Sequence, residues 1–141
     1  MTGTPDVATA LGTVPFLSGL TQKQLKMVAE SGKELAYRAG DVIVEEGTMG
    51  VGFYLVLDGK VEVRKGAKVL ASLAKGQYFG EMSLIDEQPR SADVVALQPT
   101  KCFTLSTWVF SALVKEHPEL SLPMLKEFAK RLRAAQSSPT S

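Results

Sequence analysis

The sequence predicts a mainly β fold: an antiparallel β-roll or jelly roll (a double-stranded β-helix) with flanking helices. From Glu34 onward the chain runs in short segments that are either apolar or alternating in polarity, whereas helical patterns lie before and after them. We expect an N-terminal extension over 1–13, one domain over 14–133 and a disordered tail over 134–141. Within the domain, the roll covers about 34–106 and two C-terminal helices cover 107–133. Glycines separate the short segments at positions 40, 47, 50, 52, 59, 66 and 76.

The domain is expected to begin with helical structure. Residues 14–20 form an apolar segment that indicates a short turn or helix. Thr21 then stands where an N-cap is expected, before a segment that carries Leu25, Met27 and Val28.

Turn residues separate the expected strands of the roll. The apolar segment 53–57 is followed by Asp58-Gly59 and then by the alternating segment 60–64, a pattern that predicts a hairpin with a two-residue turn. A second turn is expected at 65–68. Further strands are expected over 69–73, 91–96 and 101–105.

Two helices are expected after the roll, over 107–115 and 119–133. The second carries apolar residues at spacings of three or four, and such a stripe usually packs on a core. Pro123 falls inside it and would remove a helical hydrogen bond if the helix began near Pro118, so we expect a kink or a break there. The stripe comprises Leu122, Leu125, Phe128, Ala129 and Leu132.

Composition excludes several classes of function. A net charge of +1 and a pI near 7.8 give no reason to expect DNA or an anionic membrane as partner. The longest apolar run, residues 51–57, is too short to span a bilayer, and the N-terminus lacks the basic region of a secretory signal. The lone Cys102 fits a reducing compartment, and its place in an expected strand suggests packing rather than redox chemistry. We therefore expect a cytoplasmic protein.

The segment 79–96 carries the most functional information. It places Glu81 and Arg90 nine residues apart, at opposite ends of a short loop. An arginine presents a planar fork of donors that matches phosphate oxygens, whereas an ionised glutamate only accepts hydrogen bonds and suits a sugar hydroxyl. The loop is therefore a candidate receptor for a ligand with a hydroxyl at one end and a phosphate at the other. Taken alone, such a pair is more often a surface salt bridge.

Other residues of the loop fit the same chemistry. Gly80 lets the backbone approach a ligand closely. Residues 81–85 suffice for one helical turn, whose free N–H groups would face an anion. Pro89 restrains the backbone before Arg90. Ser91 adds a hydroxyl, and Ala92 a small side chain, where the loop packs close to the ligand.

A second pattern lies upstream, over 43–59: a strand, a glycine-rich turn, an apolar strand and a tight turn. The two patterns, in this order and at this separation, resemble those of the cyclic-nucleotide-binding family. That family includes protein kinase A regulatory subunits, the bacterial catabolite activator and cyclic-nucleotide-gated channels. The resemblance covers about 16–132, nearly the whole chain.

The resemblance implies roles for individual residues. Glu81 would hold the ribose 2′-hydroxyl and Arg90 the cyclic phosphate, with backbone N–H groups or hydroxyls supplied by their neighbours. Val63 and Leu73 occupy strand positions that line the base pocket in relatives, although ordinary core positions explain them equally well. The implied ligand residues are Phe79, Gly80, Glu81, Met82, Ser83, Arg90, Ser91 and Ala92.

The resemblance also implies that the last helix is a lid over the base of the nucleotide. No shared motif identifies the residue that caps the base, so Arg131, Leu132 and Arg133 are candidates by location only. A solvated basic helix end, favourable to the helix dipole, explains the two arginines equally well.

The implied function is that of a regulatory sensor. A cyclic nucleotide would close the phosphate-binding cassette and the last helix, changing the surface shown to an unidentified effector protein or domain. Threonine after the cassette arginine often accompanies cyclic GMP preference in kinases, and alanine accompanies cyclic AMP. Ser91 at this position also occurs in bacterial cyclic AMP receptors, so cyclic AMP is favoured over cyclic GMP.

Catalysis is not expected. His117, the single histidine, would have to act alone, and the ligand sets of a metal, haem or iron–sulfur centre are absent from the sequence. Three alternatives remain for a binding module. The fold could be a protein-interaction scaffold with an empty or differently occupied pocket, although burying an unused charged pair is costly. It could be an excised domain of a larger regulator, channel or kinase subunit. A DNA-binding regulator needs a helix-turn-helix beyond the last helix, and the sequence ends within a few residues of that helix, so we expect this alternative only if the chain is an excised fragment.

Overall fold

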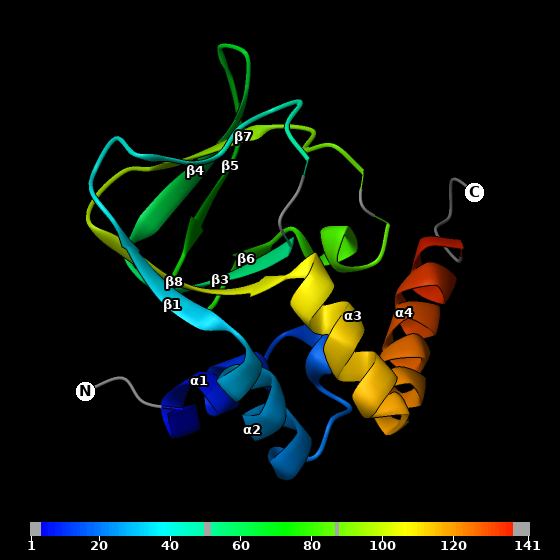
Figure 1. Cartoon of the computed structure of the whole chain (residues 1–141). Helices are drawn as coiled ribbons and strands as arrows, with labels where there is room; N and C mark the ends of the chain where they lie inside the picture. The colour runs from blue at the N-terminus through cyan, green and yellow to red at the C-terminus, as the bar shows by residue number, and fades with distance from the viewer. Residues whose placement is uncertain (1–3, 50–51, 87, 137–141) are drawn as a thin grey trace.

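The computed structural model describes residues 4–49, 52–86 and 88–136. Gly50 and Val51 of the glycine-rich turn, Glu87 of the cassette segment, and the terminal residues 1–3 and 137–141 lie outside the described residues. Two β-sheets face each other, and the helices gather against one of them (Figure 1). The elements are α1 (Thr4–Leu11), η1 (Pro15–Leu17), α2 (Gln22–Ser31), β1 (Lys33–Tyr37), β2 (Val42–Val44), β3 (Gly52–Asp58), β4 (Lys60–Lys65), β5 (Lys68–Ala74), β6 (Tyr78–Phe79), η2 (Glu81–Leu84), β7 (Asp93–Ala96), β8 (Thr100–Ser106), α3 (Thr107–Glu116), η3 (Pro118–Leu120) and α4 (Ser121–Gln136), where η marks a 3₁₀-helix.

The strands form two four-stranded antiparallel sheets, with the orders β1-β8-β3-β6 and β2-β7-β4-β5. Several strands that are distant in sequence pair with each other, as β1 with β8 and β2 with β7. This arrangement confirms the predicted antiparallel β-roll with flanking helices.

The hairpin predicted at Asp58-Gly59 is wrong. β3 pairs with β6 and β8, whereas β4 pairs with β5 and β7, so the chain passes from one sheet to the other at this turn. Gly59 has a φ of 98°, as the turn requires, and an added Cβ would lie 2.5 Å from the Thr100 hydroxyl oxygen. The local turn signal was therefore real, but it does not determine which strands pair. The second predicted turn does join a hairpin, between β4 and β5.

Strand β3 lies between two apolar layers, which explains its continuous apolar sequence. Phe53 and Leu55 pack with the helices in one core, whereas Tyr54 and Val56 pack inside the roll in a second core. The second core also contains Cys102, which is completely buried. This inner core forms the floor of the cavity described below.

The N-terminal helices cover the outer face of the sheet that contains β3 (Figure 1). Thr21 caps α2 as predicted: its hydroxyl accepts from the Gln24 N–H, and the Gln24 side chain accepts from the Thr21 N–H. Within the segment 1–13, expected as an extension, Thr4–Leu11 forms α1, and Val7 and Leu11 lie in the helix-side core.

Helix α4 begins at Ser121, so Pro123 lies in its first turn, where the missing N–H does not interrupt the ladder of hydrogen bonds. The chain changes direction instead at η3, Pro118–Leu120, between α3 and α4. α4 continues to Gln136, three residues into the expected tail. No helix in the described part of the chain has the length and apolar character needed to cross a membrane.

Candidate functional site

A cavity of about 370 Å³ opens at the predicted cassette, between η2, the loop that follows it and the inner face of the roll. All eight predicted ligand residues, from Phe79 to Ala92, line this cavity. Five further residues line the cavity although none is among the predicted ligand residues; of these the sequence singles out only Pro89, for its effect on the backbone before Arg90. The five residues are Val44, Asp86, Gln88, Pro89 and Val94.

Arg90 is buried at the base of this cavity, with only 9% of its surface exposed. Its Nη2 donates to the Gly52 carbonyl at 2.5 Å, and its Cζ lies 5.8 Å from the centre of the Tyr54 ring. Tyr54 in turn stacks on Phe79, with ring centres 4.9 Å apart. Within the described part of the chain, the buried Nε of Arg90 has no hydrogen-bond partner. A buried donor without a partner is costly, so an anionic acceptor brought to this nitrogen would remove that cost.

Burial lowers the pKa of Arg90, and the Tyr54 phenol opposes that change. An arginine nevertheless remains protonated in proteins, so the site keeps its positive charge. The reciprocal effect is seen at Tyr54, whose pKa is raised chiefly by burial and held back by Arg90. The cavity therefore has one permanent, partly desolvated cation at its base.

The backbone of Arg90 is hydrogen-bonded to the upstream glycine-rich turn. Its N–H donates to the Thr48 carbonyl at 2.8 Å, and its carbonyl accepts from the Gly47 N–H at 2.9 Å. Pro89 forms a β-bridge with Met49 beside these bonds. The two sequence patterns that carry the resemblance thus meet at the arginine.

Gly80 allows the cassette to approach Arg90. Its φ is 80°, a left-handed conformation that side chains disfavour. A Cβ at this position would collide with Nη1 of Arg90 and with the Gly52 carbonyl oxygen. Both the backbone conformation and the space therefore require glycine.

Glu81 begins the 3₁₀-helix η2, where a carboxylate is favourable near the free N–H groups. Its Oε2 lies 3.3 Å from Nη2 of Arg131 on α4, an ion pair across fifty residues of sequence. Ser83 follows in η2. Its N–H is already used by the Gly80 carbonyl, and its own carbonyl accepts from the Thr107 hydroxyl at 2.7 Å. η2 therefore contacts α3 through a hydrogen bond and α4 through an ion pair.

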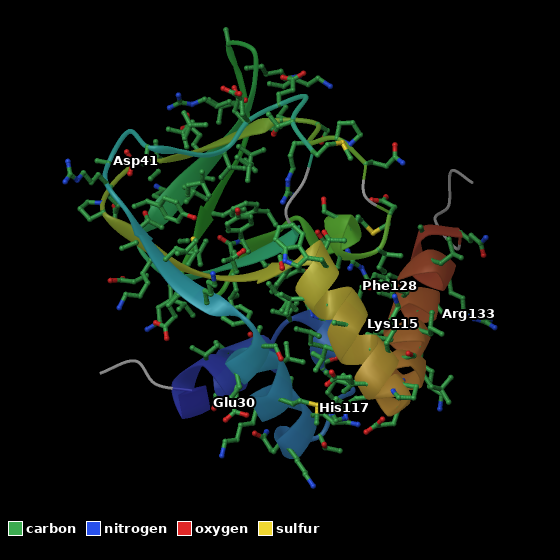
Figure 2. All side chains as sticks on the ribbon, in the orientation of Figure 1. Glu30, Asp41, Lys115, His117, Phe128 and Arg133 are labelled. Atoms are coloured by element: carbon green, nitrogen blue, oxygen red, sulfur yellow. The ribbon has the colours of Figure 1, made fainter. Side chains whose placement is uncertain are left out.

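The structure does not bring all the base-pocket candidates together. Val63 lines the cavity, and Leu73 packs against the inner core of the roll. Arg131 contacts Glu81 instead of lining the cavity, Leu132 is 61% exposed, and Arg133 is exposed. In Figure 2, Phe128 lies on the side of α4 that faces α3, whereas Arg133 lies on the outer side.

The family model of the cyclic nucleotide-binding domain matches residues 34–117 of this sequence. The chain belongs to the cyclic nucleotide-binding domain family. It is 39% identical over 105 residues to the cAMP-dependent protein kinase regulatory subunit of Schizosaccharomyces pombe, an alignment that covers 74% of this chain and 26% of the relative. It is 35% identical over 115 residues to the cGMP-dependent protein kinase of Plasmodium berghei, covering 81% of this chain and 13% of that protein.

Among solved structures, the N-terminal domain of a transcriptional regulator from Streptomyces coelicolor A3(2) superposes on this cyclic nucleotide-binding domain with a TM-score of 0.87 at 28% sequence identity. The match covers 92% of this chain and 96% of that one. The chain thus has the size of one solved domain, but it spans only a minor part of the two curated relatives.

His117 lies between α3 and η3, with its Nδ1 3.6 Å from a carboxylate oxygen of Glu119 and away from the cavity. Over residues 4–49, 52–86 and 88–136, no group of three histidine, cysteine or acidic side chains is placed to hold a metal ion. The cavity combines a buried cation, a carboxylate and an apolar wall.

Proposed function

We propose that this chain is a cyclic-nucleotide sensor in which Arg90 binds the cyclic phosphate. The observation that carries the proposal is the buried guanidinium of Arg90: the side chain lines a cavity large enough for a nucleotide-sized ligand, and its Nε has no hydrogen-bond partner among the described residues. A phosphate would supply the acceptor that none of the described residues supplies, through a charge-assisted hydrogen bond. We assign no catalytic role to the site.

The rest of the cavity suits the other parts of a nucleotide. Glu81 lines it as a hydrogen-bond acceptor for the ribose hydroxyl, while Val63 and Val44 offer apolar surface. We propose that Val63 and Leu73 lie beside the base. The base-capping residue is not assigned, because Leu132 and Arg133 are exposed and Arg131 contacts Glu81.

We propose cyclic AMP as the preferred ligand over cyclic GMP. The support is Ser91, which lines the cavity directly after Arg90, where a threonine would favour cyclic GMP. The relatives include a cAMP-dependent and a cGMP-dependent kinase, so binding of both nucleotides must be measured.

We propose that the output is a change in the position of α4. Leu122, Leu125 and Leu132 on this helix are each about 60% exposed, and an apolar groove runs between α3 and α4. Docking or release of α4 would alter this apolar surface, which an effector protein or domain could read. Because the curated relatives are much longer, the effector can belong to the same polypeptide or to another, inside the cytoplasm.

Calorimetric titration tests the proposal. The purified chain, unfolded and refolded to remove any co-purified nucleotide, is titrated separately with cyclic AMP and cyclic GMP. We expect micromolar or tighter binding, tighter for cyclic AMP. An absence of heat and of any thermal shift with both nucleotides would refute the proposal and favour a protein-interaction scaffold.

A further inference from the structure

The ion pair between Arg131 and Glu81 links the last helix to the carboxylate that is proposed to hold the ribose. Nη2 of Arg131 lies 3.3 Å from Oε2 of Glu81. The Glu81 side chain is 18% exposed and that of Arg131 is 43% exposed, so the pair lies at the mouth of the cavity rather than in free solution. Pairs this exposed contribute little to stability, which makes a role in positioning the carboxylate more relevant than a role in folding.

Arg131 depends on the docked position of α4. Met124 and Phe128 precede it by seven and three residues, which places all three on one face of the helix. Met124 is buried, and the Phe128 ring stacks on Phe16 with centres 5.7 Å apart and planes at 22°. The guanidinium therefore reaches Glu81 only while this face is packed against the domain.

One carboxylate can serve two partners at once. Glu81 contacts Arg131 through Oε2, and an ionised carboxylate has a second oxygen that can accept a hydrogen bond from a sugar hydroxyl. The pKa of Tyr78 is affected by the same two charges: burial raises this pKa, Glu81 raises it further, and Arg131 opposes that change. The carboxylate, the guanidinium and the phenol thus lie within electrostatic reach of one another.

We propose that Arg131 is a positioning residue for sugar recognition: it holds Glu81 so that the carboxylate accepts from the ribose 2′-hydroxyl only when α4 is docked. The inference rests on the proposed binding of a cyclic nucleotide. It adds that the sugar, through Glu81, is the part of the ligand that is coupled to the last helix. Because coupling is reciprocal, loss of Arg131 must reduce the affinity gained from the 2′-hydroxyl.

The test compares cyclic AMP with 2′-deoxy cyclic AMP, which lacks that hydroxyl. Dissociation constants of both ligands are measured by calorimetry for the wild type, Arg131→Gln, Arg131→Lys and the control Lys126→Gln, which removes one exposed charge from the same helix. In the wild type and the control we expect cyclic AMP to bind about tenfold or more tightly than the deoxy ligand, the value of one hydrogen bond to a charged group. Arg131→Gln should reduce that ratio to about threefold or less, and Arg131→Lys should restore part of it.

Glu81→Gln and the double variant with Arg131→Gln complete a cycle. If the two residues act as one unit, the ratio of affinities for cyclic AMP and 2′-deoxy cyclic AMP should be no smaller in the double variant than in Glu81→Gln alone. An unchanged ratio in Arg131→Gln would overturn this proposal and leave the proposed function standing, as would an equal loss of affinity for both ligands. Failure of the wild type to bind either ligand would overturn the proposed function and this proposal with it.

Discussion

Replacement of Arg90 should abolish most of the nucleotide affinity while leaving the domain folded. Nη2 is already used by the Gly52 carbonyl, which leaves the unpartnered Nε and the remaining N–H groups to the phosphate. Two charge-assisted hydrogen bonds at about 1.5–3 kcal/mol each amount to about 3–6 kcal/mol, or roughly a hundredfold to ten-thousandfold in dissociation constant. Arg90→Ala should therefore weaken cyclic AMP binding by that factor.

Two companion variants separate charge from geometry. Arg90→Lys keeps the charge but not the planar fork, so we expect an intermediate loss. Glu81→Ala removes one hydrogen bond from a neutral hydroxyl to a carboxylate, a loss of about 1.5–3 kcal/mol and thus smaller than that of Arg90→Ala. Arg38→Ala, at an exposed position outside the cavity, serves as the control and should bind like the wild type.

The assay is calorimetry, accompanied by thermal denaturation of each ligand-free variant. The melting temperature of ligand-free Arg90→Ala should remain close to that of the wild type, because the buried cation it removes is itself costly to hold in the fold. Its melting temperature should no longer rise on addition of cyclic AMP. Equal binding by the wild type and a folded Arg90→Ala would refute the assignment of the phosphate site.

Three further predictions concern the fold around the site. Gly80→Ala should lower both stability and nucleotide affinity, because the added Cβ collides with Arg90 and alanine is strained at a positive φ. Gly76 also has a positive φ, 89°, but a Cβ there would meet nothing within 4 Å, so the control Gly76→Ala should lower stability alone. Denaturant titration measures the stability of both variants, and calorimetry measures their affinity. Thr21→Ala removes the cap of α2 and should lower the free energy of unfolding by about 1 kcal/mol, and an unchanged urea midpoint would contradict it. Burial raises the pKa of the Cys102 thiol from 9.0 to about 12. The stability that the protonated thiol contributes is therefore complete below pH 9 and is lost as the pH rises towards 12. Cys102→Ala should make this loss of stability with pH less steep, and an identical loss in both proteins would contradict the prediction.

The sequence was sufficient for the parts of the fold that depend on local patterns. Alternation and glycine spacing predicted most strands, and the Thr21 cap was predicted from its position alone. Which strands pair with each other was harder to predict from the sequence. The Asp58-Gly59 turn has the sequence of a hairpin turn, but it carries the chain from one sheet to the other. Helix α1 was missed because its short, weakly apolar sequence becomes helical structure only where Val7 and Leu11 reach the core.

The residues of the site also divide into those that the sequence predicts and those that only the fold reveals. Glu81 and Arg90 stand out in sequence because their chemistry matches the two ends of one ligand, and the structure places both on one cavity. Tyr54 was hidden, since an aromatic residue in an apolar strand looks like ordinary core until the fold sets it beside the guanidinium. The contact between Arg131 and Glu81 joins residues fifty positions apart and has no local signal.

The central claim, that Arg90 binds the phosphate through its unpartnered Nε, is tested most directly by the ¹H–¹⁵N spectrum of the arginine side chains. The Nε–H signal of Arg90 is assigned by its absence from Arg90→Lys, and cyclic AMP is then added to saturation. We predict that this signal shifts downfield as the phosphate accepts its hydrogen bond, while that of exposed Arg38 stays in place. Saturation with cyclic AMP that leaves the Arg90 signal unmoved would contradict the account.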